Sequence, residues 1–134
     1  GLLAMLYYGK SRWTGDDDHI LLTGMSDGAT YSLLAALHAD SPFTHVAPFS
    51  GVLHPELATT GRLRYASGRP IYLVHGKLDW MFPIETAWMA RQELENAGAD
   101  LVFREIDDLS HNYARALNPD VLDWFNPALG IPGN

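Results

Sequence analysis

The stretch Ile20-Leu21-Leu22-Thr23-Gly24-Met25-Ser26-Asp27-Gly28 decides the fold, because it joins an apolar run to a serine flanked by glycines. Ile20–Thr23 is short and apolar, which predicts a buried strand. Ala29–Ala39, which follows at once, is rich in Ala and Leu and predicts a helix. Ser26 would therefore lie in a sharp turn between strand and helix, where Gly24 and Gly28 let the two elements approach closely.

Strands and helices alternate along the rest of the chain. Because the expected strands are apolar throughout, they predict a parallel sheet with both faces covered by helices. The other expected strands are Thr44–Phe49, Ile71–His75 and Leu101–Ile106; the other expected helices run from Pro83 to Ala97 and near Asp120–Phe125. Val52–Arg69 contains Pro55, Gly61 and Gly68, and is expected to be irregular.

The beginning of the chain is apolar over Gly1–Gly9 but lacks the basic start of a signal peptide. Leu2, Leu3 and Leu6 have helical spacing, which predicts the end of a helix. Ser11–Asp18 holds a glycine and three consecutive acids, which predicts a loop. Four strands would make a thin sheet, so we expect residues 1–134 to be a single partial domain, the C-terminal portion of an N-terminally truncated α/β domain.

Composition excludes several classes of function. A chain of 134 residues with 47% hydrophobic residues can build one compact core. A net charge of −7 and a pI near 5.1 argue against nucleic acid and anionic membrane surfaces as partners. The longest apolar runs are far shorter than the roughly 18 residues of a membrane span. The absence of cysteine excludes disulfides, thiolate metal sites and a cysteine nucleophile.

Ser26 would need a base to act as a nucleophile. His111 follows the last expected strand, at the sheet edge where the carboxyl ends of parallel strands gather beside Ser26. His45 begins a strand at the opposite edge, and His75 precedes Gly76, which suggests a role in backbone packing. The six candidates are His19, His38, His45, His54, His75 and His111, and we favour His111.

An acid must orient that base and stabilise its cationic form. Asp79 follows Ile71–His75 in a loop at the same edge and is favoured over Asp107 and Asp108, which share the loop of His111. The helix after Ser26 would also present the N–H of Asp27 to a developing oxyanion. Asp16-Asp17-Asp18-His19 lacks the spacing of a calcium loop and predicts a solvated turn, so no metal is expected.

Gly24–Gly28, His75-Gly76-x-x-Asp79 and Leu109-Ser110-His111, in the order Ser, Asp, His, resemble the α/β-hydrolase superfamily. The chain looks most like the phospholipase/carboxylesterase and polyhydroxybutyrate-depolymerase-like esterases, from about Asp18 to Phe125. The motifs similar to theirs are Thr23–Gly28, Ala47–Gly51 and His75–Pro83. The resemblance implies a serine esterase that forms an acyl-enzyme at Ser26 and acts on small-molecule esters without a cofactor.

Members of the superfamily carry a loop, often containing His-Gly, that supplies a second oxyanion donor before the serine, and this sequence has no such segment upstream of Ser26. The resemblance also places Leu53, Trp80 and Phe82 at the mouth of an apolar acyl pocket, beside Val52, His54, Met81 and Tyr113. Ordinary core packing is the alternative interpretation for each. Two other functions stay open: a serine peptidase on the same fold, and a non-catalytic binding or scaffold fragment.

Overall fold

The computed structural model describes residues 6–12, 18–111 and 114–125. Five strands form one sheet in the order β1-β2-β3-β4-β5. The strands from β2 to β5 are parallel, and β1 pairs antiparallel with β2. The strands are β1 (Leu6–Arg12), β2 (Asp18–Met25), β3 (His45–Phe49), β4 (Pro70–Gly76) and β5 (Asp100–Ile106).

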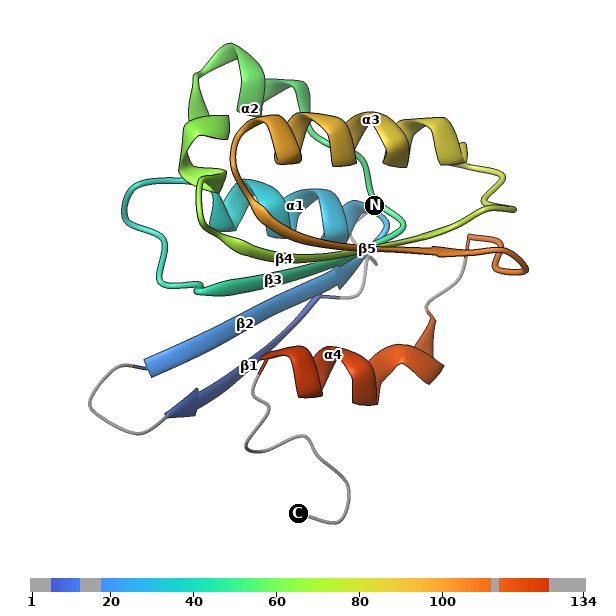
Figure 1. The fold of residues 1–134 in the computed structure, drawn as a ribbon, viewed down its shortest axis with the longest axis horizontal. Coiled ribbons are helices and arrows are strands. Elements are labelled where there is room, and N and C mark those ends of the chain that lie inside the picture. The colour runs from blue at the N-terminus through green and yellow to red at the C-terminus, as the bar shows by residue number, and fades with distance from the viewer. Residues whose placement is uncertain (1–5, 13–17, 112–113, 126–134) are drawn as a thin grey trace.

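Helices cover both faces of this sheet, as Figure 1 shows. On one face lie α1 (Asp27–Ala36), α2 (Pro55–Thr59), the 3₁₀ helix η1 (Arg62–Ala66) and α3 (Ile84–Asn96). On the other lies α4 (Asn118–Phe125), preceded by the 3₁₀ helix η2 (Arg115–Leu117). The expected α/β fold with a parallel sheet is confirmed, and each expected strand and helix after Ile20 corresponds to an observed element.

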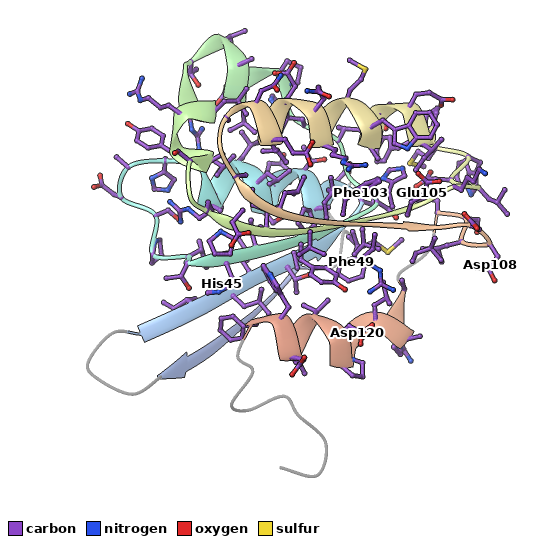
Figure 2. All side chains as sticks on the ribbon, viewed as in Figure 1. His45, Phe49, Phe103, Glu105, Asp108 and Asp120 are labelled. Atoms are coloured by element: carbon purple, nitrogen blue, oxygen red, sulfur yellow. The ribbon has the colours of Figure 1, made fainter. Side chains whose placement is uncertain are left out.

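Alternate residues of the strands feed two separate cores, because successive side chains of a strand point to opposite faces. Val46 and Ile71 pack with Leu33 of α1 and Leu94 of α3. On the opposite face, Phe49 packs with residues of α4, and Figure 2 shows its ring between the sheet and that helix. The sheet is thus buried on both sides, which explains why the sequences of its inner strands are mostly apolar.

The expectation of a helix at the beginning of the chain is wrong for its described part. Leu6–Arg12 forms β1, which pairs with β2 from Leu6 opposite Gly24 to Arg12 opposite Asp18. Pairing with the open edge of β2 outweighs a weak local pattern of leucines. Leu2 and Leu3 lie outside the described residues. The expected loop Ser11–Asp18 is also wrong at its ends, since Ser11 and Arg12 belong to β1 and Asp18 to β2, and its residues 13–17 lie outside the described residues.

Val52–Arg69 is likewise more regular than expected, since it contains α2 and η1. Pro55 does not break structure here but starts α2, where its missing N–H is no loss. His54 caps the helix, its Nδ1 accepting a hydrogen bond from the N–H of Glu56 at 3.0 Å. Leu57 and Ala66 are fully buried, so both short helices are anchored in the hydrophobic core on the side of the sheet covered by α1 and α3.

Candidate active site

Ser26 occupies the turn between β2 and α1 with a positive φ of 59° and ψ of −120°. A non-glycine residue held in so sparsely populated a conformation costs about 1–3 kcal/mol. The N–H of Ser26 donates to the carbonyl of Phe49 at 2.9 Å, which continues the β2–β3 pairing through the turn. The carbonyl of Ser26 accepts from Ala29 and Thr30 at 3.0 and 3.1 Å, so the same residue starts α1.

Gly24 permits this turn to be so tight. A Cβ at position 24 would lie 2.4 Å from the carbonyl oxygen of Gly28, a distance that real Cβ atoms do not show. Strand β2 and the first turn of α1 therefore press together directly behind Ser26. The side chain of Ser26 is carried at the amino end of α1, where the helix dipole is positive.

The loops after β4 and β5 are held against each other by their backbones. The N–H groups of Lys77 and Leu78 donate to the carbonyls of Ile106 and Leu109 at 2.8 and 3.0 Å. Gly76 makes this approach possible, since a Cβ there would lie 2.1 Å from the carbonyl oxygen of Leu109. These contacts bring the loop that carries Asp79 beside the loop that carries His111.

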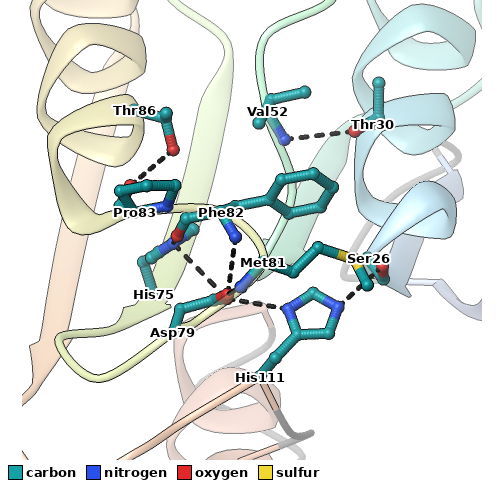
Figure 3. A network of polar contacts seen from close by, with 10 residues as sticks. All are labelled: Ser26, Thr30, Val52, His75, Asp79, Met81, Phe82, Pro83, Thr86 and His111. Atoms are coloured by element: carbon teal, nitrogen blue, oxygen red, sulfur yellow. Dashed lines mark hydrogen bonds and ion pairs between the residues drawn. The ribbon is translucent and has the colours of Figure 1, made fainter.

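Three side chains from these segments form a continuous hydrogen-bonded chain (Figure 3). His111 Nε2 lies 2.9 Å from Ser26 Oγ, and His111 Nδ1 lies 2.8 Å from Asp79 Oδ2. Since the carboxylate can only accept, Nδ1 carries the ring hydrogen and Nε2 accepts from the serine hydroxyl. The Asp79 side chain has 0% exposure and that of His111 has 8%, so the pair is largely shielded from water. Such an arrangement can withdraw the proton of a serine hydroxyl.

Asp79 is held by two further hydrogen bonds that sequence patterns did not reveal. Its Oδ1 accepts from the backbone N–H groups of Met81 and Phe82 at 2.9 and 2.7 Å. The competing acids Asp107 and Asp108 are exposed, and Figure 2 shows Asp108 at the tip of the loop after β5. Backbone donors have no sequence signature, although an acid followed closely by a turn is a usual setting for them.

The other histidines with described side chains lie elsewhere or make other contacts. His45 begins β3 at the opposite edge of the sheet and touches the rings of Trp124 and Phe125. His38 Nδ1 accepts from the N–H of Asp40, and His54 caps α2. His75 is fully buried, with Nε2 at 2.7 Å from the carbonyl oxygen of Phe82.

The residues expected at the mouth of the pocket fall into two groups. Trp80 and Phe82 pack against the His111 ring in T-shaped arrangements, with ring centroids 5.7 and 5.3 Å away. Trp80 is 72% exposed, so it covers His111 from the solvent side. Leu53 lies between α2 and α3, where it packs against the hydrophobic core on the side of the sheet covered by α1 and α3. Tyr113 lies outside the described residues.

Leu53 also lines a cavity of about 320 Å³ between α2 and α3. Val52, another lining residue, donates its N–H to Thr30 Oγ1 at 3.1 Å, and Thr30 is one helical turn from Ser26. The wall of the cavity is therefore hydrogen-bonded to α1 one helical turn beyond Ser26. Its walls are mostly apolar: Val52, Leu53, His54, Pro55, Ala58, Thr86, Met89, Ala90 and Glu93.

The acidic stretch before β2 belongs partly to the sheet, because Asp18 and His19 are its first residues, which corrects the expected turn there. Asp16 and Asp17 lie outside the described residues. Among the residues that the structure describes, no group of three His, Asp or Glu side chains is arranged to hold a metal ion. The same residues contain no helix long and apolar enough to cross a bilayer.

A family model described as Phospholipase/Carboxylesterase matches residues 10–124. The chain belongs to this family. It is one of the two esterase groups that the sequence motifs resemble. No match was found among curated proteins.

Solved structures similar to this family member include esterases and a thioesterase. Esterase PE8 is 28% identical with a TM-score of 0.60, over 72% of this chain and 44% of its own. Arabidopsis thaliana SOBER1 is 23% identical with a TM-score of 0.70, over 81% and 52%. Zea mays acyl-protein thioesterase 2 is 20% identical with a TM-score of 0.61, over 76% and 52%. The chain thus spans about half the length of each of these three structures.

Proposed function

We propose that this chain carries the catalytic residues of a serine hydrolase that cleaves carboxylic esters. The observation that carries the proposal is the unbroken hydrogen-bonded chain from Ser26 Oγ through His111 to Asp79. Membership of a family of phospholipases and carboxylesterases supports the reaction class. The same constellation of nucleophile, base and acid serves acyl transfer on unrelated folds.

In the proposed reaction, Ser26 Oγ forms a bond to the ester carbonyl carbon while His111 Nε2 takes the hydroxyl proton. Asp79 stabilises the imidazolium that results. The carbon–oxygen bond to the alcohol then breaks, His111 returns its proton to the departing alkoxide, and the acyl group stays on Ser26. A water molecule attacks this acyl-enzyme as it gives a proton to His111, and that proton passes to Ser26 Oγ when the acid leaves.

Negative charge develops on the carbonyl oxygen in both steps. Asp27, the first residue of α1, follows Ser26 directly, and we assign its backbone N–H as one donor to that oxygen. The positive end of the α1 dipole would act on the same atom.

The acyl chain would enter the cavity between α2 and α3. Its lining residue Val52 is hydrogen-bonded to Thr30, one helical turn beyond Ser26, and Leu53 lies in its wall. Phe82 and Trp80 flank His111 and would contact the substrate near the scissile bond. A largely apolar cavity of about 320 Å³ suits an aliphatic chain better than a charged group.

Labelling with a fluorophosphonate tests the proposal, because the reagent requires an activated serine and assumes no substrate. We expect mass spectrometry to locate one adduct, on Ser26, and we expect His111→Ala to abolish it. Ser50→Ala is the matched control, because Ser50 has nearly the same φ of 57° at the end of β3 but is fully buried. A folded protein that stays unlabelled, or is labelled elsewhere, would overturn the assignment.

A substrate panel then separates esterase from peptidase. We expect p-nitrophenyl esters to be cleaved by the wild type and not by Ser26→Ala, with the corresponding anilides and peptides left intact. Cleavage of peptides in preference to esters would replace the proposal by the serine peptidase alternative. Circular dichroism of Ser26→Ala checks that loss of turnover is not loss of fold.

A further inference from the structure

A second histidine lies beside Asp79, near the same carboxylate oxygen that meets His111. His75, in β4, has no exposed side-chain surface, and its Nε2 lies 3.5 Å from Asp79 Oδ2. The same nitrogen lies much closer, at 2.7 Å, to the carbonyl oxygen of Phe82. Because a carbonyl only accepts hydrogen bonds, Nε2 of His75 carries a hydrogen and donates it to Phe82.

Phe82 is therefore fixed through both of its backbone groups. Its carbonyl accepts from His75, and its N–H donates to Asp79 Oδ1 at 2.7 Å. Its ring also packs against the His111 ring in a T-shaped arrangement, with centroids 5.3 Å apart. Figure 3 shows these contacts gathered on the short segment between β4 and α3. A change at His75 would thus reach both Asp79 and His111 through one residue.

An imidazole at this position lowers the stability of the fold in a way that an aliphatic side chain would not. Within the described part of the chain, His75 Nδ1 is buried and has no hydrogen-bond partner. A buried polar atom left unsatisfied costs about 1–3 kcal/mol. Core stability alone therefore gives no reason for histidine here, whereas the contact from Nε2 to Phe82 does.

We propose that His75 is a positioning residue for Asp79. It acts through Phe82 to keep the carboxylate in line with His111, and it touches neither the substrate nor the reacting atoms. This inference rests on the proposed hydrolase function. It also goes beyond the role in backbone packing that the His75-Gly76 pair suggests.

Two substitutions separate positioning from packing. His75→Leu keeps an apolar volume but removes the donor, whereas His75→Gln places an amide N–H near the position of Nε2. We expect His75→Leu to lower kcat by about 10- to 100-fold with little change in KM. We expect His75→Gln to recover most of that loss. His45→Leu is the matched control, because His45 is also a buried strand histidine but lies at the opposite edge of the sheet; its kcat should stay that of the wild type.

A spectroscopic measurement tests the same idea without turnover. The His111 Nδ1 proton, hydrogen-bonded to Asp79, should give a far-downfield proton NMR signal in the wild type. We expect this signal to shift or broaden in His75→Leu and to return in His75→Gln, with His45→Leu unchanged. A wild type that neither labels nor hydrolyses would refute the hydrolase, and the NMR comparison would still decide the role of His75. An unaltered signal and kcat in a less stable His75→Leu would overturn the proposal, as would equal losses of kcat in the Leu and Gln variants.

Discussion

Two serines have positive φ angles at the carboxyl ends of adjacent strands, Ser26 after β2 and Ser50 after β3. Each is tied to the next strand by its N–H, Ser26 to Phe49 and Ser50 to Val74, both at 2.9 Å. The sheet pairing therefore extends through both residues and offsets the strain of their conformations. The two differ in exposure: Ser26 is half-buried and meets His111, whereas Ser50 has no exposed surface.

The assignment of Asp79 as the acid that orients His111 can be tested by substitution. Asp79→Asn should lower kcat by about 10⁴-fold, because an amide that donates to His111 favours the wrong ring tautomer. Asp107→Asn and Asp108→Asn remove the same charge from exposed positions and should leave kcat unchanged. Steady-state kinetics with a p-nitrophenyl ester compares the three. A comparable loss of kcat in either control would mean that Asp107 or Asp108, in the loop of His111, acts as the acid instead.

Gly76 supplies the second prediction. In Gly76→Ala the added Cβ would meet the Leu109 carbonyl, so the loop of His111 must shift. We expect the free energy of unfolding to fall by about 1–3 kcal/mol and kcat to fall by about 100-fold.

Gly68→Ala is the control for Gly76→Ala, since a Cβ there meets nothing within 4 Å and only the positive φ of 71° opposes it. It should lose about 1–2 kcal/mol of stability and keep its kcat. Urea unfolding and initial rates measure both variants. Full activity in Gly76→Ala would show that the contact between the two loops does not position His111.

Much of the candidate site could be predicted from residue types and strand order. Parallel strands bring their carboxyl ends to one edge, so Ser26, Asp79 and His111 could be expected near one another, and the structure places them in hydrogen-bonding contact. Their catalytic roles stay a prediction. The donors to Asp79 could not be foreseen, because the N–H groups of Met81 and Phe82 depend on the path of a loop. The hydrogen bond from His75 to the carbonyl of Phe82 could not be foreseen for the same reason.

At the scale of elements, the alternating core was easier to predict than the edges. Strands β3 and β4 are apolar along their length because both faces are covered, and their ranges were predicted to within a residue. β1 was missed because its pairing with β2 depends on a sheet edge elsewhere in the chain. α2 was missed because its five residues are too few for a helical period, and Pro55 reads equally well as a turn.

The short helix α2 supplies the third prediction, because it forms one wall of the cavity. Ala58 is exposed but lines the cavity, so Ala58→Phe should shorten the space for an acyl chain. Each buried methylene contributes about 0.8 kcal/mol, or about fourfold in kcat/KM. We therefore expect Ala58→Phe to abolish the preference for octanoate over acetate esters, measured as the ratio of their kcat/KM values. Turnover of acetate esters should stay the same.

Thr59→Phe is the matched control for the cavity, since Thr59 neighbours Ala58 on α2 but is not part of the cavity wall. Its ratio of octanoate to acetate kcat/KM should equal that of the wild type. An unchanged ratio in Ala58→Phe would place the acyl chain outside this cavity.

At the scale of the molecule, α4 alone among the described α-helices covers its face of the sheet, which predicts a separation of stability from activity. Phe125 is 3% exposed and packs in the core beneath the sheet, near His45 and far from Ser26. Phe125→Ala should lower the free energy of unfolding by about 3–5 kcal/mol. The fraction that remains folded should react with fluorophosphonate at the wild-type rate.

Leu122→Ala changes the same helix at a position that is 46% exposed, and it should alter stability by less than about 1 kcal/mol. Thermal unfolding followed by circular dichroism measures both variants. A loss of labelling in folded Phe125→Ala would mean that α4 helps to shape the site.

The hydrogen bonds of the candidate site join parts of the chain that are far apart in sequence. Ser26 and His111 are separated by 85 residues, and Asp79 and His111 by 32. Contacts over such separations form late, because the entropy of closing long loops must be overcome before they stabilise anything. Ser26 can meet its base only when the strands from β2 to β5 are already paired in register. Nascent or misfolded copies, in which those strands are not yet aligned, would therefore carry a chemically inert serine.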